Sequence, residues 1–91
     1  MIIASGQENR LLDERMREGP TREHLLSVIG ERMRAERKRQ QMTLRQVADR
    51  THLSVSLLSQ IERAESAASV TSLLKIADAL RKPLQAFFEG F

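Results

Sequence analysis

The stretch that decides the fold is residues 43–63, TLRQVADRTHLSVSLLSQIER. Its first half places Leu44, Val47, Ala48 and Thr51 at positions i, i+3, i+4 and i+7, so one face of a short helix can be buried. Thr43 stands immediately before this run, where its hydroxyl can accept a hydrogen bond from a backbone N–H of the first turn. These residues predict a short amphipathic helix that begins just after Thr43.

A second short helix is predicted after a turn at His52 and Leu53, with Ser54 as its N-cap. In this helix only Leu58 and Ile61 need to face the interior. The outward side chains are then Val55, Ser56, Leu57, Ser59, Gln60 and Arg63. Small, polar and amide side chains on an exposed helix suit the major groove of DNA, so the stretch is interpreted as a helix-turn-helix.

The rest of the chain shows helical periodicity and no alternating strand pattern. Thr21 is the expected N-cap of a helix that runs to about Gln40, and polar residues 64–69 precede another helix. Pro83 fits the first turn of a final short helix. We therefore predict an all-α domain over residues 21–91. Residues 1–20 are expected to form a charged N-terminal arm, either helical or disordered.

Composition and charge narrow the class of protein. The 91 residues are 41% hydrophobic and 30% charged, which is typical of one small globular domain. The absence of cysteine fits a reducing compartment, and no segment has the length of a signal peptide or membrane span. The prediction is a soluble cytoplasmic protein without membrane contact.

The net charge of +3 is unevenly distributed. Residues 32–50 hold seven basic and two acidic residues, immediately before and within the predicted helix-turn-helix. Such a run can be an ordinary solvated helix face, but its position favours attraction to the phosphate backbone of double-stranded DNA.

Other chemistry has little support in the sequence. His24 and His52 are the two histidines and lie far apart in a chain without cysteine, so no metal site is expected. The four glycines are scattered and form no phosphate-binding loop. We predict neither catalysis nor a bound cofactor.

The three aromatic residues, Phe87, Phe88 and Phe91, all lie in the last five positions. Adjacent residues of a helix diverge by ~100°, so Phe87 and Phe88 should not both enter the core. One is expected to cover the core and the other to face a partner. The preferred interpretation is a homodimer through Leu84, Phe87, Phe88 and Phe91; the alternative is that the chain's own first helix and arm absorb these rings.

From residue 29 to residue 88 the chain resembles the Cro/phage-repressor (xenobiotic-response-element) family of five-helix, lambda-repressor-like DNA-binding domains. The matching stretches are IGERMRAERKRQQMTLRQVADRT, LSVSLLSQIER and VTSLLKIADAL. The segments TLRQVADRT and LSQIER are most similar to those of bacterial regulators that carry this domain ahead of a cupin sensor domain. No cupin segment follows residue 91, so the expectation is a stand-alone regulator or an N-terminal fragment.

The resemblance implies roles for individual residues. The base-reading residues would be Val55, Ser56, Leu57 and Gln60, with Gln60 able to pair with an adenine edge. The contacts to the DNA backbone would come from Thr43, Arg45, Gln46, Ser54, Ser59 and Arg63. Arg37 and Glu62 would form an internal ion pair that ties the first helix to the end of the recognition helix.

The chain departs from the family pattern at several turns. Gln41, His52 and Ala64 stand where the family usually has glycine, and Ala68 where it often has proline. A residue with a side chain is strained at positive φ, although histidine tolerates it better than most. Ala64 is the least comfortable, so the recognition helix is expected to run on toward Ser66.

The predicted function is a sequence-specific transcriptional regulator, a repressor that binds an inverted repeat as a dimer. Two alternatives remain open. One is the antitoxin of a toxin–antitoxin pair, with residues 7–18 binding the toxin. The other is a protein-interaction module that has kept the fold and lost DNA binding.

Overall fold

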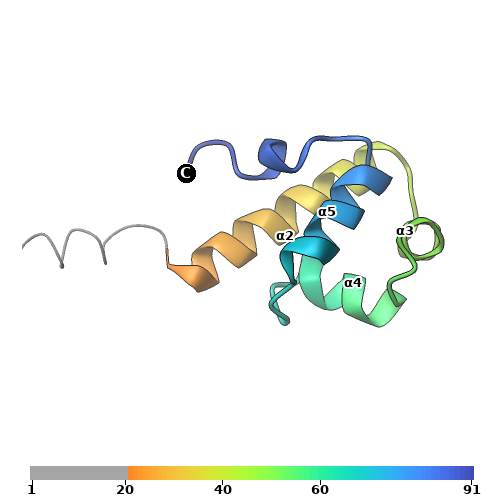
Figure 1. The fold of residues 1–91 in the computed structure, drawn as a ribbon, viewed down its shortest axis with the longest axis horizontal. Coiled ribbons are helices and arrows are strands. Elements are labelled where there is room, and N and C mark those ends of the chain that lie inside the picture. Colours follow the sequence, from red (N-terminus) through yellow and green to blue (C-terminus); the bar gives the residue numbers. More distant parts are fainter. Residues whose placement is uncertain (1–20) are drawn as a thin grey trace, which may run out of the picture.

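The structure, a computed structural model, describes residues 21–91, and the predicted arm of residues 1–20 lies outside this range. The described part is helical and contains no strand. Its elements are α2 (Arg22–Arg39), α3 (Leu44–Thr51), α4 (Val55–Glu62), α5 (Val70–Ala79) and a 3₁₀ turn, η1 (Leu84–Phe87) (Figure 1). None of these helices is sufficiently long and apolar to span a lipid bilayer.

Each of the four α-helices begins at a hydroxyl cap. The side chains of Thr21, Thr43, Ser54 and Ser69 each accept a hydrogen bond from the backbone N–H three residues later. At Thr43 the cap is reciprocal, because the Gln46 side-chain oxygen accepts from the Thr43 N–H at 2.8 Å. The predicted starts at Thr21, Thr43 and Ser54 are therefore confirmed.

Each helix is followed within two residues by a non-glycine residue in the left-handed conformation. These residues are Gln41, His52, Ala64 and Arg81, with φ between 57° and 60°. After α4, the Ala64 N–H donates to the Ile61 carbonyl at 3.1 Å and the Glu65 N–H to the Gln60 carbonyl at 2.8 Å. The expectation that the recognition helix runs on toward Ser66 is wrong, because these two bonds satisfy the last carbonyls while the chain turns away at Ala64.

The hydrophobic core draws on all the helices. Met33 of α2 and Leu80, at the end of α5, are its most deeply buried large side chains. The other buried apolar residues are Ile29, Met42, Val47, Leu58, Ile61, Leu73, Ile76, Ala77, Ala79 and Phe87. A core shared in this way fixes α4 against α2 and α3, the helices that it contacts.

Gly30 permits the closest approach between two helices. A Cβ atom built on Gly30 would lie 2.5 Å from the Ile61 carbonyl oxygen and 2.8 Å from that of Glu62. Both distances are shorter than side-chain carbons tolerate, so the backbone of α2 touches the last turn of α4 at a place where only glycine fits.

The predicted fifth helix needs correction, because the described residues form four α-helices and the short turn η1. Hydrogen bonds from Ala86 to Pro83 and from Phe88 to Gln85 span three residues and give η1 its tighter winding. Pro83 is extended and caps this turn rather than entering it. The next carbonyls, of Phe87 and Glu89, accept from the Arg32 side chain, so the chain does not continue as an α-helix.

Candidate nucleic-acid interface

The turn between α3 and α4 is set by local hydrogen bonds. The Thr51 hydroxyl donates to the Val47 carbonyl at 2.8 Å and accepts from the Leu53 N–H at 3.2 Å. His52 between them adopts the left-handed conformation, with φ of 60°. The chain thus reverses sharply, and Figure 1 shows α3 end-on while α4 runs across the view.

The outward face of α4 carries the predicted base-reading residues. Only Leu58 and Ile61 of this helix are buried, as the sequence pattern predicted. Ser56 is exposed, whereas Val55, Leu57 and Gln60 are half-buried. Leu57 also packs against the core, so part of its side chain is committed to the domain itself. The face of α4 available to a partner therefore combines polar Ser56 and Gln60 with the partly exposed apolar side chains of Val55 and Leu57.

Of the predicted backbone-contacting residues, Thr43, Arg45, Gln46 and Ser54 lie at helix starts, whereas Ser59 lies within α4 and Arg63 caps its end. Most of the six already make internal hydrogen bonds. The hydroxyls of Thr43 and Ser54 accept from backbone N–H groups, and the Gln46 amide oxygen is used in the cap of α3. Each hydroxyl can still donate its proton, and the Gln46 amide can still donate from its nitrogen. These groups therefore keep donors, which are what a phosphate requires.

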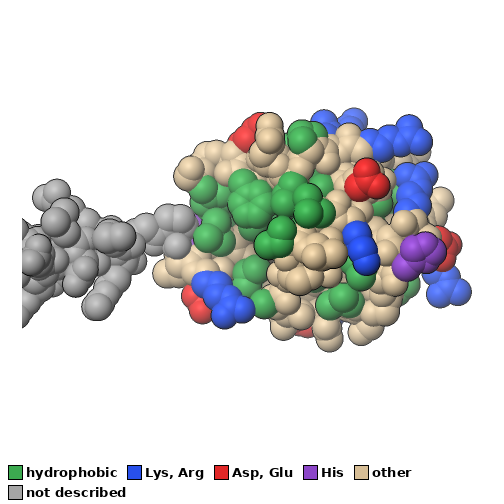
Figure 2. Space-filling model, viewed as in Figure 1, with side chains coloured by type: hydrophobic (Ala, Val, Ile, Leu, Met, Phe, Trp, Pro, Cys, Tyr) green, Lys and Arg blue, Asp and Glu red, His purple; other side chains and the backbone are tan. Residues whose placement is uncertain are grey.

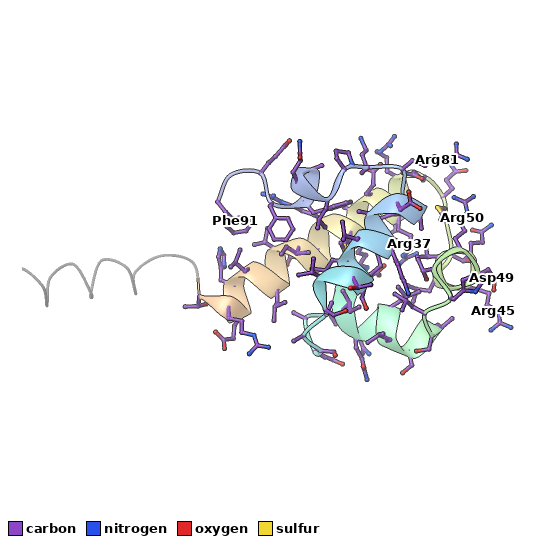
Figure 3. All side chains as sticks on the ribbon, in the orientation of Figure 1. Arg37, Arg45, Asp49, Arg50, Arg81 and Phe91 are labelled. Atoms are coloured by element: carbon purple, nitrogen blue, oxygen red, sulfur yellow. The ribbon has the colours of Figure 1, made fainter. Side chains whose placement is uncertain are left out.

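Arg45 is an exposed cation beside the turn. It lines a hollow of about 500 Å³ between α3 and the start of α4, together with Asp49, His52, Ser54 and other residues of the turn. Figure 3 shows Arg45 and Asp49 at the outer edge of α3, directed away from the core. Arg45 therefore faces the surface beside the recognition helix.

The basic run of residues 32–50 divides into two groups. Arg32, Arg37, Arg39 and Arg50 bond to their own chain. Arg50, for example, donates to the Ala79 carbonyl at 3.2 Å and so covers the end of α5. The remaining cations, Arg34, Lys38 and Arg45, are exposed and form no ion pair with any residue of 21–91. Arg32 and Arg37 are half-buried and serve the fold, whereas Arg39 and Arg50 bond to the chain and remain exposed; Figure 3 labels Arg37, Arg45 and Arg50.

Arg37 and Glu62 form the least exposed ion pair of the described residues. Arg37 Nε lies 2.7 Å from Glu62 Oε2 and Nη2 lies 2.9 Å from Oε1, while Nη1 donates to the Met42 carbonyl at 2.8 Å. The two side chains are only 12% and 11% exposed. The hydrogen bonds to Glu62 raise the pKa of Arg37 further above its usual value. With Gly30, this pair fixes the last turn of α4 to α2 at two places.

Charged and apolar side chains occupy different parts of the face in Figure 2. Lysine and arginine side chains gather at the end formed by α3 and the helix ends beside it. Apolar side chains gather nearer the middle, around Phe91 (Figures 2 and 3). Phe87 is 3% exposed and Phe88 36% exposed, so one ring enters the core and the other does not. Phe87 consequently offers no surface to a dimer partner, and Leu84 is half-buried against the core.

Several of these residues were missed by sequence reasoning. Gly30 gave no signal because its neighbour in space, Ile61, lies far along the chain. Arg50 and Arg32 were counted as charge, although both bond to carbonyls near the end of the chain. Within residues 21–91, histidine and acidic side chains form no cluster of three that could hold a metal ion.

Comparisons with known proteins agree with this geometry. The profile of the helix-turn-helix family matches residues 33–87. Among solved structures, the chain is similar to the restriction-modification controller protein C.AhdI from Aeromonas hydrophila. The TM-score is 0.67 at 27% sequence identity, and the match covers 69% of this chain and 96% of that one. A comparison with curated proteins finds no match.

Proposed function

Because this chain belongs to the Cro/C1-type helix-turn-helix family of DNA-binding transcriptional regulators, we propose that it is a sequence-specific repressor that binds an inverted repeat as a homodimer. The likeness to C.AhdI, a restriction-modification controller protein, supports the regulatory class. Family and neighbour both indicate a non-enzymatic role, exercised in the cytoplasm where a bacterial regulator meets DNA.

The observation on which the proposal rests is that α4 is fixed against α2 while part of its surface stays exposed. This helix is fixed to α2 by the Gly30 contact and by the Arg37–Glu62 pair, yet it leaves Ser56 exposed and Gln60 half-exposed. Reading a base edge needs a donor and acceptor held at a fixed distance and angle. Gln60 supplies both groups, and Val55 and Leu57 offer apolar surface to a thymine methyl group.

The grip on the DNA backbone is assigned to groups around this helix. Arg45 supplies an exposed charge, and Arg63 supplies another at the far end of α4. The remaining contacts would come from Thr43, Gln46, Ser54 and Ser59, whose side chains can each donate a hydrogen bond. Such contacts position the domain without carrying sequence information.

The dimer is proposed from the apolar surface that the domain exposes. The exposed large apolar residues of the described chain are Val70, Leu74, Phe88 and Phe91. A second copy covering part of this surface would remove it from water and would supply a second recognition helix. Two such helices ~34 Å apart can read half-sites one turn of DNA apart.

A selection of bound duplexes from a random pool, followed by sizing of the selected complex, tests the proposal. The expected result is an enriched inverted repeat carrying two protein chains. Recovery of unenriched sequences would contradict specific reading, and one chain per enriched site would contradict the dimer. The antitoxin alternative depends on residues 7–18, outside the described range, so no observation favours it.

A further inference from the structure

A hollow of about 160 Å³ lies where α2, the start of α3 and the end of α4 meet. It is lined by Arg34, Arg37, Leu44, Ser59, Glu62 and Arg63. Three of these six residues are arginines and one is a glutamate, so the lining carries a net positive charge. Arg37 pairs with Glu62 and Arg63 is assigned to the DNA backbone, but Arg34, which lies on α2, has no role so far.

The charged residues that line the hollow differ in the ion pairs that they already form. Arg37 and Glu62 neutralise one another, and their side chains are only 12% and 11% exposed. Arg34 is exposed and forms no ion pair within residues 21–91. It stands three residues before Arg37, so both lie on the same side of α2. Arg34 is therefore an exposed guanidinium in the lining without an ion-pair partner among the described residues.

The third arginine, Arg63, is occupied by weak partners. Its Nη2 lies 3.2 Å from Glu65 Oε2, and its Nε donates to the Ser59 carbonyl at 3.3 Å. The two charged side chains are 56% and 53% exposed, so water screens their attraction strongly. A phosphate can replace such a carboxylate at little cost, because guanidinium groups bind phosphate oxygens in the same forked geometry.

We propose that this hollow binds one phosphate of the DNA backbone between Arg34 and Arg63, and that Glu65 competes with that phosphate for Arg63. The inference rests on the proposed function, because the hollow adjoins the outward face of α4 through Ser59 and Arg63. Glu65 thereby weakens binding to DNA whose phosphate enters the hollow, because the phosphate must first displace the Glu65 carboxylate from Arg63. The site adds Arg34 to the interface and gives Glu65 a restraining role.

Arg34→Gln tests the phosphate contact, with Arg22→Gln as its control. Arg22 has the same charge and lies on the same helix, ~18 Å away along the axis. In titrations of duplex DNA at several salt concentrations, Arg34→Gln should lose roughly five- to tenfold in affinity at 0.1 M salt for every sequence. The slope of log affinity against log salt should become shallower by about 0.9 for each bound protein chain, while Arg22→Gln should keep the wild-type slope.

A double-mutant cycle tests the competition by Glu65. Glu65→Gln should tighten binding by roughly 1.5- to 5-fold, and this gain should vanish in an Arg63→Gln background. Glu31→Gln, which makes the same charge change on α2, should have a smaller effect that is independent of Arg63.

The possible outcomes distinguish a failure of the phosphate site from a failure of the proposed function. If wild type binds a selected duplex and Arg34→Gln keeps the wild-type salt slope, the phosphate site is overturned and the regulator remains. If the gain from Glu65→Gln persists without Arg63, the competition is overturned. If wild type binds no duplex, both the function and the site fail.

Discussion

At the scale of single residues, two small residues are important to the fold through their backbone rather than their side chains. Gly30 lies where α2 touches α4, and Ala64 closes α4 in the left-handed conformation. The sequence indicated that Ala64 would be strained, because the family usually has glycine there. It did not reveal Gly30, because close contact between two helices depends on residues far apart in the chain.

Gly30→Ala should destabilise the domain although alanine is the better helix former. The new methyl group would lie 2.5 Å from the Ile61 carbonyl oxygen, and separating the helices should cost about 1–3 kcal/mol. Thermal unfolding should show a lower Tm by roughly 4–8 °C per kcal/mol. Helix propensity alone would raise the stability by up to about 1 kcal/mol, so an unchanged or higher Tm would refute the close contact.

Ala64→Gly should have the opposite effect. The left-handed φ of 58° costs alanine about 1 kcal/mol that glycine does not lose, although glycine gains freedom in the unfolded chain. We expect a net stabilisation of about 0.5 kcal/mol in chemical denaturation. Ala35→Gly, inside α2, is the matched control and should lose about 1 kcal/mol. A loss at both positions would show that Ala64 is not strained.

At the scale of helices, the sequence predicted features set by neighbouring residues and missed contacts between residues far apart in the chain. The caps at Thr21, Thr43 and Ser54 and the buried pair Leu58 and Ile61 follow from patterns within one turn or two. The final short helix forms as the 3₁₀ turn η1 rather than as an α-helix, and the carbonyls of Phe87 and Glu89 accept from Arg32, a residue far back in the chain. The contact between Arg32 and these carbonyls joins residues more than fifty positions apart, so no local sequence pattern indicates it.

Glu36 links the ends of two helices and makes stability depend on pH. Its carboxylate accepts from Arg39 and Gln40, and Gln40 also donates to the Leu80 carbonyl. The hydrogen bond from Arg39, followed by that from Gln40, lowers the pKa of Glu36 from 4.5 to about 2. Because the folded pKa lies below the unfolded value, this contribution is complete above about pH 4.5 and disappears as the pH falls toward 2.

We therefore expect Glu36→Gln to lower Tm at pH 6 and to flatten the fall in Tm between pH 5 and pH 2. Thermal melts at intervals of one pH unit would measure this difference. Glu31→Gln, on the same helix outside the cluster, is the control. Parallel curves for wild type and Glu36→Gln would show that the cluster contributes nothing to acid sensitivity.

At the scale of the whole molecule, the family and the all-helical fold could be predicted because the helix-turn-helix pattern is contiguous. The distribution of exposed charge could not be predicted from the sequence. Seven basic residues lie between positions 32 and 50, yet Arg32, Arg37, Arg39 and Arg50 bond to their own chain. Only Arg32 and Arg37 of these four are half-buried, so counting basic residues overstated the exposed charge by these two and did not show that Arg34 lines a hollow beside α4.

The central claim is that α4 reads bases, and it is tested most directly by comparing Gln60→Ala with Arg45→Ala on a selected duplex and a random duplex. Gln60→Ala should lose about 1–3 kcal/mol of binding free energy at one base pair of the selected site and almost nothing on random DNA. Arg45→Ala should weaken both duplexes alike. If Gln60→Ala weakens the two duplexes equally, α4 does not read sequence and the account is contradicted.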